Sequence, residues 1–162
     1  MLSTKDYIRL YNSSCSNDPQ VRYALNEYNN ELLKKYPFLR LSDEYPTNLT
    51  WADYMEDGWR IAFGEQMFDE IKEELIRINC LYDYRIIDIK EKFGELRWYD
   101  TGYPTEPKLQ SIIDKYNKIS KTTCIKCGKP AKYIAMGWIT PYCEDCIPEV
   151  LKKSAKEIET QT

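Results

Sequence analysis

The chain has 162 residues, of which 43% are hydrophobic and 14% aromatic, and this composition excludes a disordered polymer. Its formal net charge is −3, and it contains no apolar run long enough to cross a membrane. It also contains no histidine, which excludes His-dependent catalytic triads and His-ligated metal centres. The sequence predicts a soluble, cytoplasmic, globular protein with one ordinary domain and a small appendage.

Two helices are predicted near the N-terminus, over residues 4–12 and 19–36. The pair Asp18-Pro19 begins the second helix, because Asp caps helices and proline is tolerated at the first helical position. Pro37 ends this helix, because it restricts the residue before it. Residues 37–49 then form an extended connection, of a length that is often functional.

The longest helical pattern covers residues 59–79, with apolar residues recurring on one face. A capping-box pattern over residues 50–53 precedes it and opens a short turn that Gly58 closes. A second face carries three acids at four-residue intervals, namely Glu65, Asp69 and Glu73. Such a stripe can bind a divalent metal, but a solvated face paired with neighbouring bases is the favoured interpretation.

Residues 84–100 change to the two-residue period of strands, and Phe93-Gly94 interrupts them, so a β-hairpin is predicted. A further amphipathic helix follows over residues 107–120. The predicted fold class is therefore α+β, with helices packed on a small antiparallel hairpin. This body spans residues 1–120, and residues 121–162 form a zinc ribbon with two strands that turn near Gly137, followed by a C-terminal helix.

Two Cys-x-x-Cys pairs, separated by 15 residues, carry the most specific signal of the chain. Zn²⁺ takes four thiolates tetrahedrally, and a two-residue gap lets one tight turn direct both sulfurs at the same point. The spacing falls within the range of known zinc sites. The predicted ligands of one structural Zn²⁺ are Cys124, Cys127, Cys143 and Cys146.

Two other interpretations of the cysteine pairs are less favoured. Disulfides are disfavoured because no secretory signal opens the chain, and a thioredoxin-like redox pair expects a βαβ context that the pattern lacks. The remaining cysteines, Cys15 and Cys80, are each predicted to be small buried hydrophobes, because nothing adjacent in the sequence lowers a thiol pKa.

The outer face of the hairpin is a candidate anion site. If Phe93 and Gly94 are the turn residues, Lys90 lies directly opposite Arg97, and like charges so placed are destabilising unless an anion or a carboxylate lies across them. The alternative is that neighbouring acids neutralise the bases locally. The candidate ligand residues are Lys90, Lys92, Arg97, Trp98 and Tyr99.

Several strings of the sequence resemble a family of small proteins of unassigned function from bacteriophages and bacterial genomes. They are Asp-Gly-Trp-Arg-Ile-Ala-Phe-Gly over 57–64, Ile-Lys-Glu-Lys-Phe-Gly-Glu-Leu-Arg-Trp-Tyr over 89–99, and the Cys-x-x-Cys-Gly start of the ribbon. The likeness extends over residues 33–146. The resemblance implies a phage accessory protein in the host cytoplasm, and it brings no catalytic residues.

Four functions are compatible with these observations. The favoured one is a non-enzymatic, zinc-stapled module that binds a host protein, such as a component of antiviral defence, since no catalytic constellation is recognisable. The second is nucleic-acid binding by the ribbon, through Lys121, Lys126, Lys129, Lys132 and Trp138. The third is a small anionic ligand resembling a nucleotide, held on the hairpin, and metal-assisted phosphodiester cleavage is the fourth and least favoured.

Overall fold

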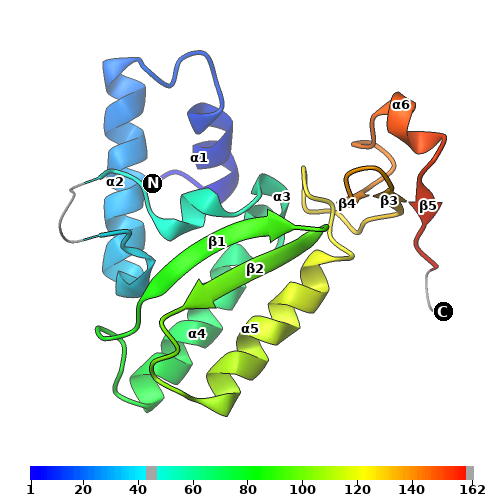
Figure 1. Cartoon of the computed structure of the whole chain (residues 1–162). Coiled ribbons are helices and arrows are strands. Elements are labelled where there is room, and N and C mark those ends of the chain that lie inside the picture. Colours follow the sequence, from blue (N-terminus) through cyan, green and yellow to red (C-terminus); the bar gives the residue numbers. More distant parts are fainter. Residues whose placement is uncertain (43–46, 160–162) are drawn as a thin grey trace.

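The computed structural model describes residues 1–42 and 47–159, and Figure 1 shows an α+β arrangement of helices around one hairpin, followed by a small C-terminal sheet. Part of the predicted connection over residues 37–49 lies outside the described residues. No helix within the described ranges is long and apolar enough to span a membrane.

The first two helices form as their caps predict. Helix α1 (Thr4–Tyr11) is capped by Ser3, whose side chain accepts a hydrogen bond from the backbone of Asp6 at 3.1 Å. Helix α2 (Pro19–Lys35) is capped by Asp18, whose carboxylate accepts hydrogen bonds from the first turn. The short helix η1 (Pro37–Leu39) follows and buries its apolar side chains in the core.

The predicted central helix is longer at its start than the sequence indicated. The capping box at Thr50 and Asp53 is present, and it begins η2 (Trp51–Tyr54). The next helix then runs through three consecutive segments without interruption. These are α3 (Asp57–Trp59), the π-helical turn η3 (Arg60–Gly64) and α4 (Glu65–Arg77).

The prediction that Gly58 closes a turn is therefore wrong, because Gly58 lies inside the helix. Glycine is needed at this position because the helix packs closely against the backbone of Cys124, and not because a helix ends there.

Strands β1 (Ile86–Lys92) and β2 (Glu95–Asp100) form the predicted hairpin, in the predicted register. Lys90 pairs with Arg97, and Phe93 and Gly94 both have positive φ angles, of 55° and 75°. Two consecutive positive φ angles define the type I′ turn, whose twist matches that of the strands.

Helices α4 and α5 (Pro107–Ser120) pack together beneath the hairpin, as Figure 1 shows in green and yellow. The hairpin directs Ile89, Leu96 and Trp98 into this core. Ser120, at the end of α5, accepts a hydrogen bond from the backbone of Leu96 at 2.9 Å and so ties the helix to strand β2. The opposite face of the hairpin carries the alternating polar residues.

The C-terminal sheet has the strand order β4-β3-β5 and is antiparallel throughout. Strands β3 (Tyr133–Ala135) and β4 (Thr140–Tyr142) turn near Gly137, as predicted. Helix α6 (Glu149–Lys152) is short, and β5 (Lys156–Glu157) was not predicted. A two-residue strand of charged residues has no periodic signal, and β5 forms because β3 offers it a free edge.

Candidate metal centre

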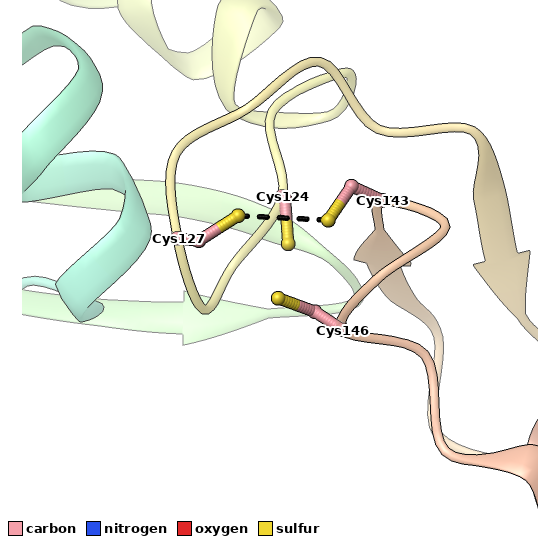
Figure 2. Close-up of side chains that lie close together, drawn as sticks. All are labelled: Cys124, Cys127, Cys143 and Cys146. Carbon is pink, nitrogen blue, oxygen red and sulfur yellow. Dashed lines mark hydrogen bonds between the residues drawn. The ribbon is translucent and has the colours of Figure 1, made fainter.

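The four cysteines of the two Cys-x-x-Cys pairs meet at one point. Their sulfur atoms all lie within 4.8 Å of one another, and the Sγ atoms of Cys127 and Cys143 are 3.5 Å apart. Figure 2 shows the four side chains directed toward a common centre, two from each of two facing loops. The first loop lies between α5 and β3, and the second follows β4.

These distances fit a tetrahedral metal. With metal–sulfur bonds of about 2.3 Å, the sulfurs of a zinc tetrathiolate lie about 3.8 Å apart, so only a small contraction of the longest separation is needed. An all-sulfur set favours a soft or borderline ion over magnesium or calcium. The cluster could therefore hold one metal ion, with all four positions supplied by the chain.

Both loops have the backbone of metal-binding turns. The N–H of Gly128 donates to the carbonyl of Cys124 at 3.0 Å, and the N–H of Ile147 donates to the carbonyl of Cys143 at 3.2 Å. Burial raises the pKa of Cys124, but hydrogen bonds from the backbone of Cys143 and Cys127 outweigh burial and lower that pKa to about 7. The backbone hydrogen bonds therefore favour the thiolate form of Cys124.

Burial has the opposite net effect on the neighbours, and it raises the pKa of Cys127 and Cys146. Four like charges cannot gather in one place without a counter-ion, whereas a divalent cation stabilises every thiolate at once. The electrostatics of the cluster therefore agree with its geometry.

The first cysteine loop is packed directly against the start of the central helix. The N–H of Gly58 donates to the carbonyl of Ile125 at 2.9 Å, and the indole Nε1 of Trp59 donates to the carbonyl of Thr123 at 3.1 Å. A Cβ atom on Gly58 would lie 2.1 Å from the carbonyl oxygen of Cys124, which is closer than van der Waals contact permits. The contact between helix and loop hence requires glycine at this position.

Within the described residues, the cysteines are the one group of three or more metal-binding side chains that lie close enough to share an ion. Two of the three acids on the second face of the central helix accept hydrogen bonds from other parts of the chain. Tyr36 donates to Asp69 at 2.7 Å, and Thr4 donates to Glu65 at 3.2 Å. Of the remaining cysteines, Cys80 is buried as predicted, whereas Cys15 is exposed. Cys15 lies in the polar loop after α1, which no core covers.

Most lysines proposed to contact nucleic acid are paired with acids of the chain. Lys129 lies 2.9 Å from Asp145, and Lys132 lies 2.6 Å from Glu144. Lys121 lies 3.4 Å from Glu95 of the hairpin. Lys126 forms no ion pair in the part of the chain that the structure describes.

Two of the three hairpin bases, Lys90 and Arg97, are paired with acids in a similar way. Lys90 forms an ion pair with Asp88, and Arg97 lies 3.0 Å from Glu95. Lys92 lies over the ring of Phe93, at 5.6 Å from its centroid. The local acids thus relieve the repulsion across the strands, which removes the physical reason for placing an anion there.

Trp98 does not lie on the outer face of the hairpin with the other candidate ligand residues. Its side chain is 6% exposed, it faces the core, and its Nε1 donates to the hydroxyl of Tyr84 at 2.8 Å. Tyr99, on the other side of the strand, is half-exposed beside Lys90. The alternation of a strand places Trp98 and Tyr99 on opposite faces, so they cannot share a ligand.

The tip of the hairpin and the turn of the ribbon form one exposed aromatic surface. Phe93 is 66% exposed and Trp138 is 77% exposed. Gly94 packs on the turn, where its Cβ position lies 3.1 Å from the carbonyl oxygen of Ile139. The indole Nε1 of Trp138 donates to Glu91 at 3.3 Å and so fixes the ring beside the hairpin.

A buried polar network between α1, α2 and η3 was not expected from the sequence. Arg60 donates to Asp53 at 2.9 Å, Tyr7 donates to the same carboxylate oxygen at 2.7 Å, and Asn29 donates to the Tyr7 hydroxyl at 2.9 Å. All four side chains are almost completely buried. The capping role of Asp53 was readable, but the partners come from distant parts of the chain.

Comparisons with known proteins add no further assignment, because no family model, curated protein or solved structure matches the chain. The resemblance to phage and bacterial proteins thus stays a prediction from the quoted motifs.

Proposed function

We propose that the chain is a non-enzymatic binding module, in which a structural zinc holds the ribbon on the body and the joint surface binds a protein partner. The surface consists of the exposed residues Phe93, Trp138 and Ile139, with Lys92 of the hairpin and Lys126 of the first cysteine loop as its proposed basic members. We refer to these five residues as the tip surface. The resemblance to phage proteins suggests a partner in a host cell, such as a protein of antiviral defence.

The observation that carries this proposal is the exposure of Phe93 and Trp138 on elements that are firmly held. Isolated exposed apolar residues are common, but clustered aromatics on a rigid support are typical of binding hot spots. The type I′ turn fixes the backbone at Phe93, and the hydrogen bond to Glu91 holds the ring of Trp138. Part of the cost of ordering this surface is therefore met before a partner binds.

Charge favours a protein over a nucleic acid. The lysines Lys121, Lys129 and Lys132 already have acidic partners, so contacts to phosphates would first have to break these pairs. The net charge of −3 adds a general repulsion toward polyanions. Lys92 and Lys126 leave a small positive rim, which suits a partner with acidic residues around an apolar centre.

The proposed metal has a structural role, because four thiolates leave no open position for a substrate. When bound, it joins the two cysteine loops and so holds the ribbon turn with Trp138 against the hairpin tip. We expect purified, reduced protein to contain one zinc ion per chain.

The function is tested by affinity purification from host cells with three forms of the protein. The wild type is compared with Phe93→Ala/Trp138→Ala and with a matched variant, Tyr23→Ala/Tyr82→Ala, whose rings are 68% and 71% exposed elsewhere on the molecule. We expect a protein that the wild type and the matched variant retain and the tip variant loses. Reconstitution with the purified partner should show affinity weakened by about a hundredfold, since two hot-spot aromatics contribute about 1–2 kcal/mol each.

The proposal is wrong if the tip variant retains every partner of the wild type. Recovery of nuclease-sensitive material, whose binding falls steeply with added salt, would instead support the nucleic-acid alternative.

A further inference from the structure

A polar recess lies between α1, α2 and residues 48–49. Its volume is about 410 Å³, which is within the range of small-molecule sites. None of the described residues that line it carries a carboxylate. The polar and aromatic lining includes Tyr7, Tyr11, Arg22, Asn26, Asn29 and Asn48.

The buried network holds Asn29 in one orientation. Its Nδ2 donates to the Tyr7 hydroxyl at 2.9 Å, to the carbonyl of Asn48 at 2.7 Å and to Asp53 at 3.2 Å. Rotating the amide would place an acceptor against these acceptors, so Oδ1 must be the atom left over. This oxygen is buried and has no hydrogen-bond partner among the described residues.

An unpartnered buried acceptor is uncommon, because its lost hydration is not repaid. Asn29 is one of the residues that line the recess, so this unsatisfied acceptor belongs to its wall. A donor group of a ligand in the recess would supply the missing hydrogen bond, and the network already holds the amide in one orientation.

A stack of aromatic rings ends at the same recess. Tyr7 packs against Tyr28 with ring centroids 4.5 Å apart, and Tyr11 packs against Tyr7 at 5.9 Å with the planes 19° from parallel. Tyr11 is 42% exposed, so its ring remains accessible to a planar group. Arg22 is exposed at the recess and forms no ion pair in the described ranges.

We propose that this recess binds a nucleoside phosphate. A nucleobase supplies both a planar ring for Tyr11 and an N–H donor for the Oδ1 of Asn29, and its phosphate supplies an anion for Arg22. The described part of the lining carries Arg22 and no carboxylate, which suits an anionic ligand. This site is separate from the tip surface, so it does not depend on the proposed protein partner.

Isothermal titration calorimetry tests the site, using the full zinc-loaded chain and the monophosphates AMP, GMP, CMP and UMP in turn. Adenosine and inorganic phosphate are titrated as the separate halves of a ligand. We expect one nucleotide to bind with one-to-one stoichiometry and a Kd below about 1 mM, and each half to bind at least about tenfold more weakly.

Two variants locate the binding. Tyr11→Ala and Arg22→Gln should each weaken the nucleotide by about tenfold, and their melting temperatures should stay near that of the wild type, because both side chains are exposed. Tyr23→Ala and Arg9→Gln are the matched controls, on the same two helices but outside the recess, and should bind normally.

The proposal is overturned if no nucleotide binds at millimolar concentration, or if inorganic phosphate binds as tightly as every nucleotide. It is also overturned if Tyr11→Ala and Arg22→Gln bind like the controls, because the ligand would then lie elsewhere. A tip variant, Phe93→Ala/Trp138→Ala, should retain nucleotide binding, so failure of the proposed protein partnership is distinguishable from failure of this site.

Discussion

Gly58 shows how one residue can join two parts of a fold. The N–H groups at the start of a helix have no partner within the helix, and here the N–H of Gly58 finds the carbonyl of Ile125 in the first cysteine loop. Gly128, on the loop side, makes the reciprocal approach, since its Cβ position lies 2.6 Å from the carbonyl oxygen of Gly58. The backbones meet with no space for side chains between them.

The first prediction follows from this contact. Gly58→Ala should destabilise the protein by about 3 kcal/mol in urea unfolding, because the new methyl group meets backbone atoms that no rotamer change can move aside. Gly137→Ala is the matched control, since a Cβ atom there has nothing within 4 Å. Equal midpoints for the two variants would show that the helix and the loop separate easily.

For individual residues, the sequence predicted the role of the cysteines. It did not predict that Gly58 and Gly128 allow the cysteine loop to pack against the helix. The spacing of the cysteines reflects the geometry of a metal, which is the same in every protein. The need for glycine at Gly58 arises from a loop more than sixty residues later in the chain, and local patterns contain no information about that approach.

At the scale of elements, a buried carboxylate clasps α4 to α5. Glu74, 2% exposed, lies 3.2 Å from Lys108 of α5 and accepts hydrogen bonds from Arg77 on its own helix. Arg77 in turn lies 3.4 Å from Glu106, the residue that caps α5. The hydrogen bonds from Arg77, with a further contribution from Lys108, outweigh burial and lower the pKa of Glu74 to about 2.

This clasp predicts a pH dependence. The pKa of Glu74 is lower in the folded state than its ordinary value of 4.5, so its contribution to stability is complete above pH 4.5 and is lost as the pH falls toward about 2. In that window the stability of the wild type should fall more steeply than that of Glu74→Gln, by at most about 1.4 kcal/mol per pH unit. Urea unfolding at several pH values measures the difference.

Glu73→Gln is the control for this experiment, because Glu73 is exposed and adjacent on the same helix. Its profile should follow the wild type. Parallel profiles for the wild type and Glu74→Gln would contradict a lowered pKa at Glu74.

The elements themselves were predictable where a local rule governs them. The hairpin register follows from the turn at Phe93 and Gly94, since the turn fixes which residues face each other. The burial of Trp98 follows from the same alternation, which places it on the face opposite Tyr99. Arg60 was not predicted as a buried partner of Asp53 because a π-helical turn changes which side chains share a helix face.

At the scale of the whole molecule, the ribbon and the body share one interface around the metal centre. One edge of it is the contact of Gly58 and Trp59 with the first cysteine loop, and the other is the contact of Glu91 with Trp138. Residues 121–159 bury few apolar side chains of their own, so a metal held by the four cysteines would add to the stability of this segment.

The last prediction is that loss of the metal weakens the body as well as the ribbon. Cys143→Ser removes one ligand, so the second cysteine loop should separate from the first. The first loop should then become mobile, and the contact of Ile125 with the helix should weaken. In hydrogen exchange the amide of Gly58 should lose its protection, and the melting temperature should fall by about 10 °C if the lost packing is worth about 3 kcal/mol. Treatment of the wild type with a chelator should produce the same change.

Cys15→Ser is the matched control, because Cys15 is exposed and lies outside the cluster. It should exchange and melt like the wild type.

If Cys143→Ser also keeps the Gly58 amide protected and melts normally, then the body folds without help from the ribbon. The metal would in that case order only the last forty residues, and the tip surface would lose one of its two supports without the hairpin being affected. A full effect at Gly58 instead means that metal content sets the stability of the entire chain, because the orphan N–H at the start of the central helix has its partner only in the metal-bound loop.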